Sequence, residues 1–199
     1  MIIIIMEVTK KSYYKVRKTT LEMLRDRGYN ISTEYEIPYD EFLIQLDNDD
    51  IDMVIEDGDK IIYIYFHVSE KNLSKKEFVS LIDRTTKEYE NLHIIIITPS
   101  KLNQTLKKEI KKLDNCESFL MKELLFNITR HVLIPEMRLL NKDEINQVVK
   151  KFRVSANKLP KFLLTDPVVR YYGGKTGDVF EIKRISLGSG VNITYRCVK

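Results

Sequence analysis

The pattern of apolar and polar positions changes period several times over the first 125 residues. Apolar residues recur every three or four positions where helices are expected, and they alternate or run continuously where strands are expected. The pattern predicts helices at 10–28, 75–90 and 102–113, and strands at 51–57, 60–68 and 93–98. The first two strands join across Asp57-Gly58, which is a strong hairpin signal. This helix–strand alternation predicts an α/β sandwich with a mixed sheet.

Three shorter stretches complete the pattern of this half. The opening "MIIIIM" is too short for a signal-peptide core or a bilayer span, and it predicts the start of a buried strand. The acidic "DNDD" at 47–50 predicts an exposed loop. The continuous β-branched run "HIIIIT" at 93–98 is typical of a strand buried on both faces.

The second half has a different pattern. Asn141 and Glu144 have the spacing of a capping box, and the apolar stripe behind them predicts a helix. Two strands are expected to close the chain. One face of the last strand carries Val191, Ile193, Tyr195 and Cys197. We therefore expect Cys197 to lie in the core.

Charge is distributed unevenly along the chain, whose net charge is +4. Residues 1–129 carry 19 Lys/Arg and 23 Asp/Glu, a net −4, whereas residues 130–199 carry 14 and 6, a net +8. Such asymmetry suggests two domains with different partners, and the basic part suits nucleic acid or an acidic protein surface. We predict an α+β chain with an N-terminal α/β domain at 1–128 and a small mixed α/β domain at 129–199.

The stretch "VRYYGGKTGDVF" resembles the end of a phosphate-binding loop. The complete motif needs a glycine five residues before Gly174, where this chain has Val169, and a helix must follow the loop. The residues after Gly177 alternate as a strand does. The sequence therefore indicates a turn, in which Gly173, Gly174 and Gly177 serve the backbone geometry.

Catalytic and metal-binding alternatives find little support. Acidic residues crowd around 47–57, as in metal-dependent nucleases, but the next strand, "YIYFHV", lacks the acid and lysine that such enzymes need. Cys116 and Cys197 have neither metal-ligand spacing nor a paired histidine, and this pattern suits a reducing compartment. The Arg- and Tyr-dense "DPVVRYYGGK" fits a nucleic-acid surface or a protein docking site equally well.

The C-terminal third resembles a known family. It runs from "HVLIPEMRLL" through "LPKF" and "DPVVRYYGG" to "TYRCVK". This resembles the fifth common subunit of eukaryotic nuclear RNA polymerases, whose archaeal counterpart consists of this domain alone. The matching positions are His131, Leu133, Pro135, Leu159, Pro160, Asp166, Pro167, Val168, Arg170, Tyr171, Tyr172, Gly173, Gly177, Arg184, Tyr195 and Arg196. "KVRKTTLEMLRDRGYNIS" and "ESFLMKELLFNITRHVLIP" extend the resemblance to the eukaryotic two-domain form.

The resemblance implies a non-catalytic polymerase subunit. In this family the C-terminal domain docks on the largest subunit, and the N-terminal domain forms part of the lower jaw beside downstream duplex DNA. It implies assembly roles for His131, Pro135, Asp166, Pro167, Arg170, Tyr171, Tyr172, Gly177, Arg184, Tyr195 and Arg196. It implies proximity to DNA for Thr98, Pro99, Ser100 and Lys101. Expected partners are the largest and neighbouring subunits and DNA, with no catalytic residue, cofactor, metal, membrane or small-molecule ligand.

Some residues depart from the family pattern. Met137 replaces a second histidine, and "KRISLGSG" replaces a segment that usually holds a proline and an acid. These departures and the Ile- and Lys-rich composition suggest a divergent copy, cellular in a nucleus or viral in cytoplasm or virion. The alternative interpretation is a stand-alone DNA-binding or nuclease-like protein.

Overall fold

The computed structural model describes residues 2–69, 71–186 and 190–199 and divides the chain into two compact units. The N-terminal unit is Met1–Phe126 and the C-terminal unit is Asn127–Lys199. Each unit combines helices with a mixed sheet, which confirms the predicted α+β class.

The N-terminal unit contains four helices, four strands and two short 3-10 turns within the described residues. Its helices are α1 (Ile2–Asp26), α2 (Tyr39–Asp47), α3 (Lys75–Glu88) and α4 (Gln104–Ile110). Its strands are β1 (Met53–Asp57), β2 (Lys60–Phe66), β3 (Leu92–Thr98) and β4 (Cys116–Leu120). The 3-10 turns are η1 (Thr33–Tyr35) and η2 (Met121–Glu123).

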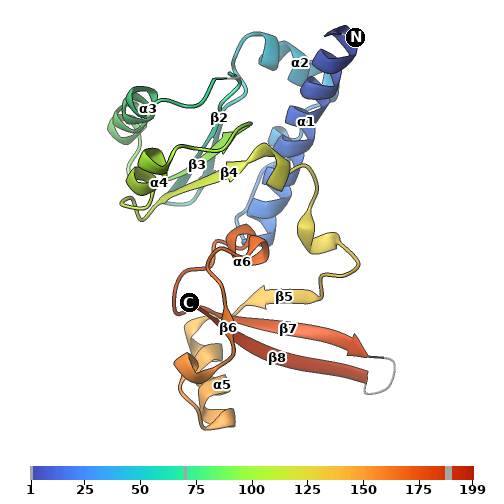
Figure 1. Cartoon of the computed structure of the whole chain (residues 1–199), viewed down its shortest axis with the longest axis vertical. Coiled ribbons are helices and arrows are strands. Elements are labelled where there is room, and N and C mark those ends of the chain that lie inside the picture. The colour runs from blue at the N-terminus through green and yellow to red at the C-terminus, as the bar shows by residue number, and fades with distance from the viewer. Residues whose placement is uncertain (1, 70, 187–189) are drawn as a thin grey trace. The chain divides into compact units, whose positions relative to one another are not determined.

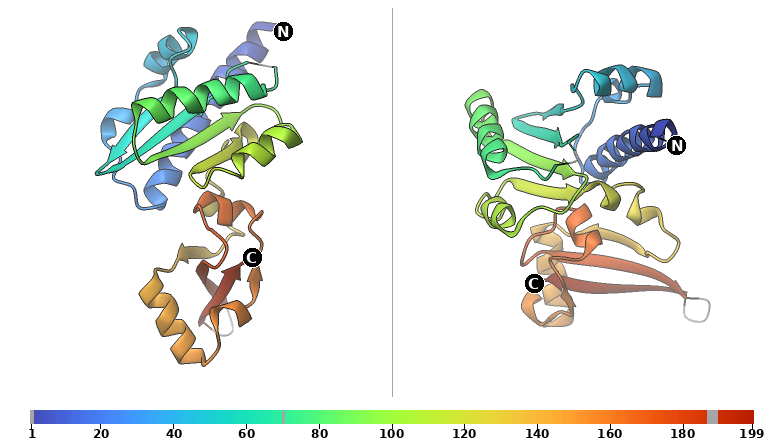
Figure 2. Two further views of the ribbon diagram at one scale, coloured as in Figure 1. Left: turned by 90° about the vertical axis from the view of Figure 1, so that its left-hand side faces the viewer. Right: turned by 45° about the horizontal axis from the view of Figure 1, so that its top comes forward.

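The four strands form one sheet in the order β1-β2-β3-β4. β1 and β2 are antiparallel with Asp57 opposite Lys60, and Gly58 in the two-residue turn has φ 61°, so the predicted hairpin is confirmed. β2–β3 and β3–β4 are parallel, as connections through α3 and α4 require. α3 and α4 cover one face of the sheet, and α1 covers the other (Figures 1 and 2).

β3 lies in the centre of this core. Ile94 and Ile96 pack in one cluster with Phe78 of α3 and Leu106 of α4. Ile95 and the other alternate residues face the α1 side, because side chains alternate along a strand. β3 is buried from Ile94 to Thr98, which confirms the prediction of a strand buried on both faces.

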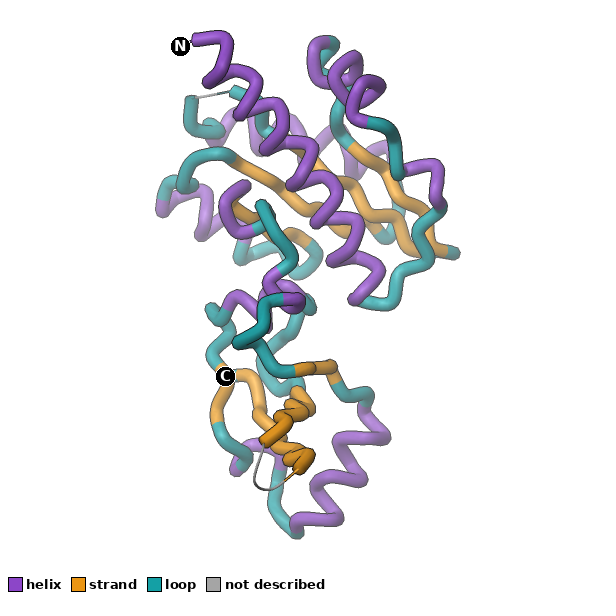
Figure 3. The backbone as a smooth tube through the Cα atoms, turned by 90° about the vertical axis from the view of Figure 1, so that its right-hand side faces the viewer, coloured by secondary structure: helices purple, strands orange, loops and turns teal. Residues whose placement is uncertain are grey.

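The prediction for the opening residues is wrong. Residues 2–6 belong to α1, a single helix that lies across the sheet (Figure 3). Isoleucine has only a slightly lower helix propensity than alanine, and each added residue forms a further hydrogen bond once a helix exists. The β-branched composition therefore does not outweigh propagation from the strongly helical segment that follows.

α2 was absent from the sequence-based prediction. Pro38 precedes it, acids occupy its first turn, and Phe42 and Leu46 are buried at a four-residue spacing. These are recognisable helix signals, but the helix has only nine residues. Residues 47–50 are exposed as predicted, although Asp47 is the last residue of α2.

The C-terminal unit is built on a second sheet, in the order β5-β7-β8-β6. Its strands are β5 (Glu136–Leu139), β6 (Lys161–Phe162), β7 (Val179–Ser186) and β8 (Gly190–Val198). Its helices are α5 (Lys142–Phe152) and α6 (Pro167–Tyr171), with 3-10 turns η3 (Ile128–Arg130) and η4 (Ala156–Lys158). β7 and β8 are the two predicted closing strands, and they pair as an antiparallel hairpin.

The two faces of this sheet pack against different helices. Phe180 and Ile182 of β7 form one cluster with the valines of α6, whereas Val179 and Cys197 form another with Val148 of α5. Cys197 is fully buried, as predicted. The predicted capping box at the start of α5 is present, with the N–H of Glu144 2.9 Å from the Asn141 side chain and the reciprocal bond also formed.

Within the part of the chain that the structure describes, every helix is too short or too polar to cross a bilayer.

Candidate functional site

The "DPVVRYY" segment forms α6, and its first two residues explain why. The side chain of Asp166 accepts a hydrogen bond from the N–H of Val168 at 2.9 Å, so it caps the helix. Pro167 occupies the first turn, where no backbone N–H is needed. Asp166 and Pro167 therefore begin this helix whatever further contact they make.

The two tyrosines of α6 differ in exposure. Tyr171 is only 2% exposed, whereas Tyr172 is half-buried and its ring packs edge-on against Phe180. The rings of Tyr171 and Tyr172 also pack edge-on against each other, 5.4 Å apart. Arg170 is half-buried, so it keeps some surface available to a partner, and Tyr171 keeps almost none.

The "GGKTG" segment is a turn that uses its own backbone donors. The N–H of Lys175 donates to the Asp178 carboxylate at 2.7 Å, and the N–H of Gly177 donates to the Val198 carbonyl at 3.0 Å. These donors are not free to bind a phosphate. β7 then follows rather than a helix, so the prediction of a turn is confirmed.

The glycines serve different purposes. Gly173 and Gly177 have φ of 66° and 96°, a conformation that favours glycine, as predicted. Gly174 instead has little room for a side chain, because a Cβ there would lie 3.0 Å from side-chain atoms of both Val169 and Phe180.

Gly174→Ala is expected to destabilise the C-terminal unit by about 1–3 kcal/mol, because the added methyl overpacks this contact. Chemical denaturation followed by circular dichroism measures the loss. Lys175→Ala is the matched control, since the Lys175 side chain is exposed and its N–H is retained. Equal stability of the two variants would contradict the packing role.

The remaining predicted assembly residues are spread over the unit. Tyr195 donates its hydroxyl to Glu181 at 3.2 Å, and the Arg196 guanidinium lies over the Phe162 ring. Arg184 is exposed on β7. His131 is exposed and accepts the N–H of Leu133 at its Nδ1, and half-buried Pro135 immediately precedes β5. The predicted set is therefore not gathered into one pocket.

Sequence reasoning missed Arg138, which ties three elements together. From β5, its guanidinium donates to Glu144 of α5 at 2.6 Å and to Glu181 of β7 at 2.9 Å. These hydrogen bonds raise the pKa of Arg138, and burial opposes them. No local signal identifies this residue, because its partners are 6 and 43 positions away.

The loop after β3 carries the residues predicted to lie near DNA. Thr98 is fully buried and donates its hydroxyl to the Ser100 carbonyl at 2.9 Å. Ser100 donates to the Asn72 side chain at 2.6 Å. Pro99 and Lys101 are exposed. Thr98 therefore shapes the loop from inside, and only the other three residues offer surface.

A second feature missed by sequence reasoning is an ion-pair cluster at the end of α1. Arg27 makes two hydrogen bonds of 2.9 Å to the Glu117 carboxylate on β4, and the Arg27 side chain is 6% exposed. His93 Nε2 of β3 lies 3.0 Å from the same carboxylate. Burial raises the pKa of Glu117, but the contacts with His93 and Arg27 outweigh it and hold the pKa at about 2.

Among the acidic residues at 47–57, Asp52 directs its carboxylate toward neighbouring groups of the fold. Its carboxylate accepts the N–H of Phe66 at 2.9 Å and the hydroxyl of Tyr63 at 2.8 Å. Burial raises the pKa of Asp52, and these two hydrogen bonds only partly oppose it. Asp52 thus acts as an internal acceptor, and no cluster of three potential metal ligands exists among the described residues.

Cys116 and Cys197 are both free. Burial, with a smaller contribution from Glu117, raises the pKa of the Cys116 thiol to about 12. A thiol with such a pKa is protonated near neutral pH and is a poor nucleophile.

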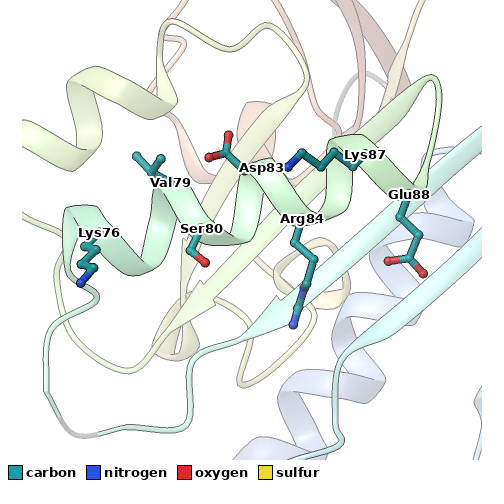
Figure 4. A pocket seen from close by; sticks show the side chains of 7 residues that line it. All are labelled: Lys76, Val79, Ser80, Asp83, Arg84, Lys87 and Glu88. Carbon is teal, nitrogen blue, oxygen red and sulfur yellow. The ribbon is translucent and has the colours of Figure 1, made fainter.

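A shallow, open pocket of about 690 Å³ lies along α3 (Figure 4). Its lining consists of Lys76, Val79, Ser80, Asp83, Arg84, Lys87 and Glu88. Arg84 reaches from the helix toward the sheet, where its Nη2 donates to the Tyr63 hydroxyl at 3.1 Å. The lining includes neither histidine nor cysteine.

Comparison with known proteins places both units in one family. Residues 7–85 match the RNA polymerase Rpb5 N-terminal domain, and residues 126–198 match the RNA polymerase Rpb5 C-terminal domain. The first match lies in the N-terminal unit, and the second begins at its last residue, Phe126, and covers nearly all of the C-terminal unit.

Full-length relatives agree with the domain matches. The chain is 33% identical to "DNA-directed RNA polymerases I, II, and III subunit rpabc1" of Dictyostelium discoideum, covering 92% of this chain and 96% of that protein. It is 32% identical to "DNA-directed RNA polymerases IV and V subunit 5B" of Arabidopsis thaliana, covering 94% and 89%. It is 28% identical to the RPABC1 subunit of Caenorhabditis elegans, covering 93% and 94%. The chain therefore belongs to the Rpb5 family, the eukaryotic-type fifth subunit of DNA-directed RNA polymerases.

Proposed function

We propose that this chain is a non-catalytic subunit that helps to assemble a DNA-directed RNA polymerase and to position downstream DNA. The C-terminal unit docks on the largest subunit, and the N-terminal unit forms part of the lower jaw. The observation that carries the proposal is the match across both units to relatives named as polymerase subunits.

The surface of the C-terminal unit supports a docking role. Val132, Leu133, Leu163 and Leu164 are all exposed, although leucine and valine are usually buried. The net +8 of residues 130–199 adds electrostatic attraction toward an acidic partner surface. Exposed apolar side chains on a unit with a net positive charge suit a protein interface.

Charge within the N-terminal unit supports a DNA-facing side. Residues 28–59, which include α2 and β1, carry eleven Asp/Glu and no Lys/Arg. Residues 71–112, which include α3 and α4, carry ten Lys/Arg and five Asp/Glu. The loop of Pro99, Ser100 and Lys101 leads into α4 and belongs to the basic side. Phosphates favour that side, although the unit as a whole is acidic.

Affinity purification of the tagged full-length chain from its own cells tests the proposal. We expect the largest polymerase subunit to co-purify in stoichiometric amount. Consistent absence of the largest subunit from purifications in which the tagged chain is folded would refute the proposal. Metal-dependent DNA cleavage by the purified chain would favour the nuclease-like alternative instead.

Lys101→Ala is expected to weaken binding of downstream duplex DNA by the assembled polymerase. Losing one phosphate contact should reduce the slope of log affinity against log salt concentration by about one. Titrations of a fluorescent duplex at several salt concentrations measure this slope. Lys60→Ala, which removes an exposed lysine at the start of β2, directly after the acidic segment, is the control. Identical slopes for the two variants would place Lys101 away from DNA.

A further inference from the structure

β8 is an edge strand over most of its length. β7 pairs with it from Gly190 to Cys197, but β6 pairs with its other side only at Cys197 and Val198. Among the strands that the structure describes, none pairs with that side between Gly190 and Arg196. Figure 1 shows the β7–β8 hairpin projecting beyond β5, β6 and α5.

The backbone of this edge is oriented for further pairing. The N–H groups of Cys197 and Lys199 each donate at 2.9 Å to carbonyls in or next to β6, whereas Val198 donates at 2.8 Å toward β7. The direction of these groups alternates along a regular strand. The outward N–H and C=O groups therefore belong to Tyr195, Ile193 and Val191.

The edge also lacks the usual protection against pairing. Natural edge strands carry charges, prolines or bulges that prevent association. From Gly190 to Tyr195 the sequence has no charged residue and no proline, and the register with β7 is continuous, without a bulge. Val191 and Ile193 are 55% and 47% exposed, and Ile185, opposite Val191 on β7, is 84% exposed. An uncharged edge of this kind with exposed apolar side chains favours a covering strand.

We propose that the open edge of β8 receives an extended segment of the largest polymerase subunit as an added strand. This inference rests on the proposed function and deepens it by naming the mode of docking. A strand of about five residues would cover 191–195 and use the outward backbone groups. It would alternate apolar residues, beside Val191 and Ile193, with polar residues, beside Asn192 and Thr194.

Charge further specifies the incoming segment. Arg184 is exposed on β7 and half-buried Arg196 lies at the inner end of the open edge, in a region whose net charge is +8. Acidic residues flanking the apolar strand would complement these cations. The expected ligand is therefore an extended segment that alternates apolar with polar residues and has acidic flanks.

Ile193→Pro tests the edge directly. Proline removes an outward N–H that the hairpin itself does not use, and edge strands tolerate proline at such positions. Ile193→Ala is the matched control, since it shortens the same side chain and keeps the N–H. Affinity for the co-expressed largest subunit of the same organism should fall about tenfold or more for the proline variant, and clearly less for alanine. Thermal melting of both variants checks that the unit remains folded.

Hydrogen exchange on the wild-type protein provides a second measurement. The amides of Val191, Ile193 and Tyr195 should exchange rapidly in the free chain and become protected in the complex. Unchanged exchange on complex formation would overturn the inference, even if Ile193→Pro proved unstable.

The outcomes separate the two proposals. If the wild-type chain does not bind the largest subunit, the proposed function fails. If it binds and Ile193→Pro binds as well as Ile193→Ala, strand addition is refuted and the proposed function stands. If instead the free chain forms a dimer that Ile193→Pro abolishes, the edge pairs with a second copy, and the assignment to the largest subunit is overturned.

Discussion

Arg27→Ala is expected to destabilise the N-terminal unit by about 3–5 kcal/mol, because it leaves the Glu117 carboxylate without its main counter-charge. Arg27 lies just after α1 and holds Glu117 of β4 through two hydrogen bonds of 2.9 Å. The Arg27 side chain is almost fully buried, so water cannot replace the lost contacts well. The free energy of unfolding of this unit, monitored by hydrogen exchange of its peptides, measures the loss.

Lys10→Ala is the control for this prediction. Lys10 pairs with Asp47 at 2.6 Å, but the Asp47 side chain is 62% exposed. An exposed pair of this kind contributes about 1 kcal/mol or less. If Arg27→Ala and Lys10→Ala lower the free energy of unfolding by the same amount, burial of the Arg27–Glu117 pair has no energetic consequence. The interpretation is then wrong.

The cluster of Glu117 with His93 and Arg27 gives stability a pH dependence with a definite sign. The pKa of Glu117 in the fold is about 2, below its ordinary value of 4.5. A carboxyl group with a lowered pKa contributes stability above its unfolded pKa, and this contribution is lost as pH falls through the folded value. We expect stability to decline by about 3 kcal/mol from this group between roughly pH 4.5 and 2. The Arg27→Ala variant should show a smaller decline.

Phe180→Ala is expected to destabilise the C-terminal unit by about 3–5 kcal/mol, the usual cost of emptying a buried phenylalanine site. Phe180 is fully buried and packs edge-on against Phe162 and Tyr172. Its side chain joins β7 to β6 and α6, so no neighbouring element can easily fill the cavity. The chain has no tryptophan, so peptide-resolved hydrogen exchange is the suitable measurement, and it also reports each unit separately.

Phe152→Ala is the control at the other face of the sheet. Phe152 is 49% exposed and makes one edge-on contact with Tyr195. Removing the Phe152 ring should lower the free energy of unfolding of the C-terminal unit by about 1 kcal/mol. An equal loss for Phe152 and Phe180 would show that the cluster around Phe180 is not the main core of the unit.

The strongest local patterns predicted the fold well. The "HIIIIT" strand, the Asp57-Gly58 hairpin, the Asn141–Glu144 capping box and the face that carries Cys197 each depend on a few consecutive residues. Such features follow from backbone geometry and short-range hydrogen bonding. The opening of α1 and the short α2 were missed because propensity alone decides poorly there.

Candidate site residues were harder to assign from sequence. Asp166, Pro167 and Gly177 match the family pattern, and the structure gives each a local backbone role. Tyr171 and Thr98 were selected in the same way, yet both are buried. A motif identifies which residues matter to a family, but it does not separate those that face a partner from those that pack inside.

The sequence by itself determined the class, the helix and strand periods, the turn at "GGKTG" and the membership of the Rpb5 family. These depend on neighbouring residues or on motifs that survive in order along the chain. Only the tertiary structure decided that Arg27 meets Glu117 from 90 positions away and that β8 keeps an open edge. Such features arise when distant segments become neighbours, and their energies depend on burial that no local pattern records.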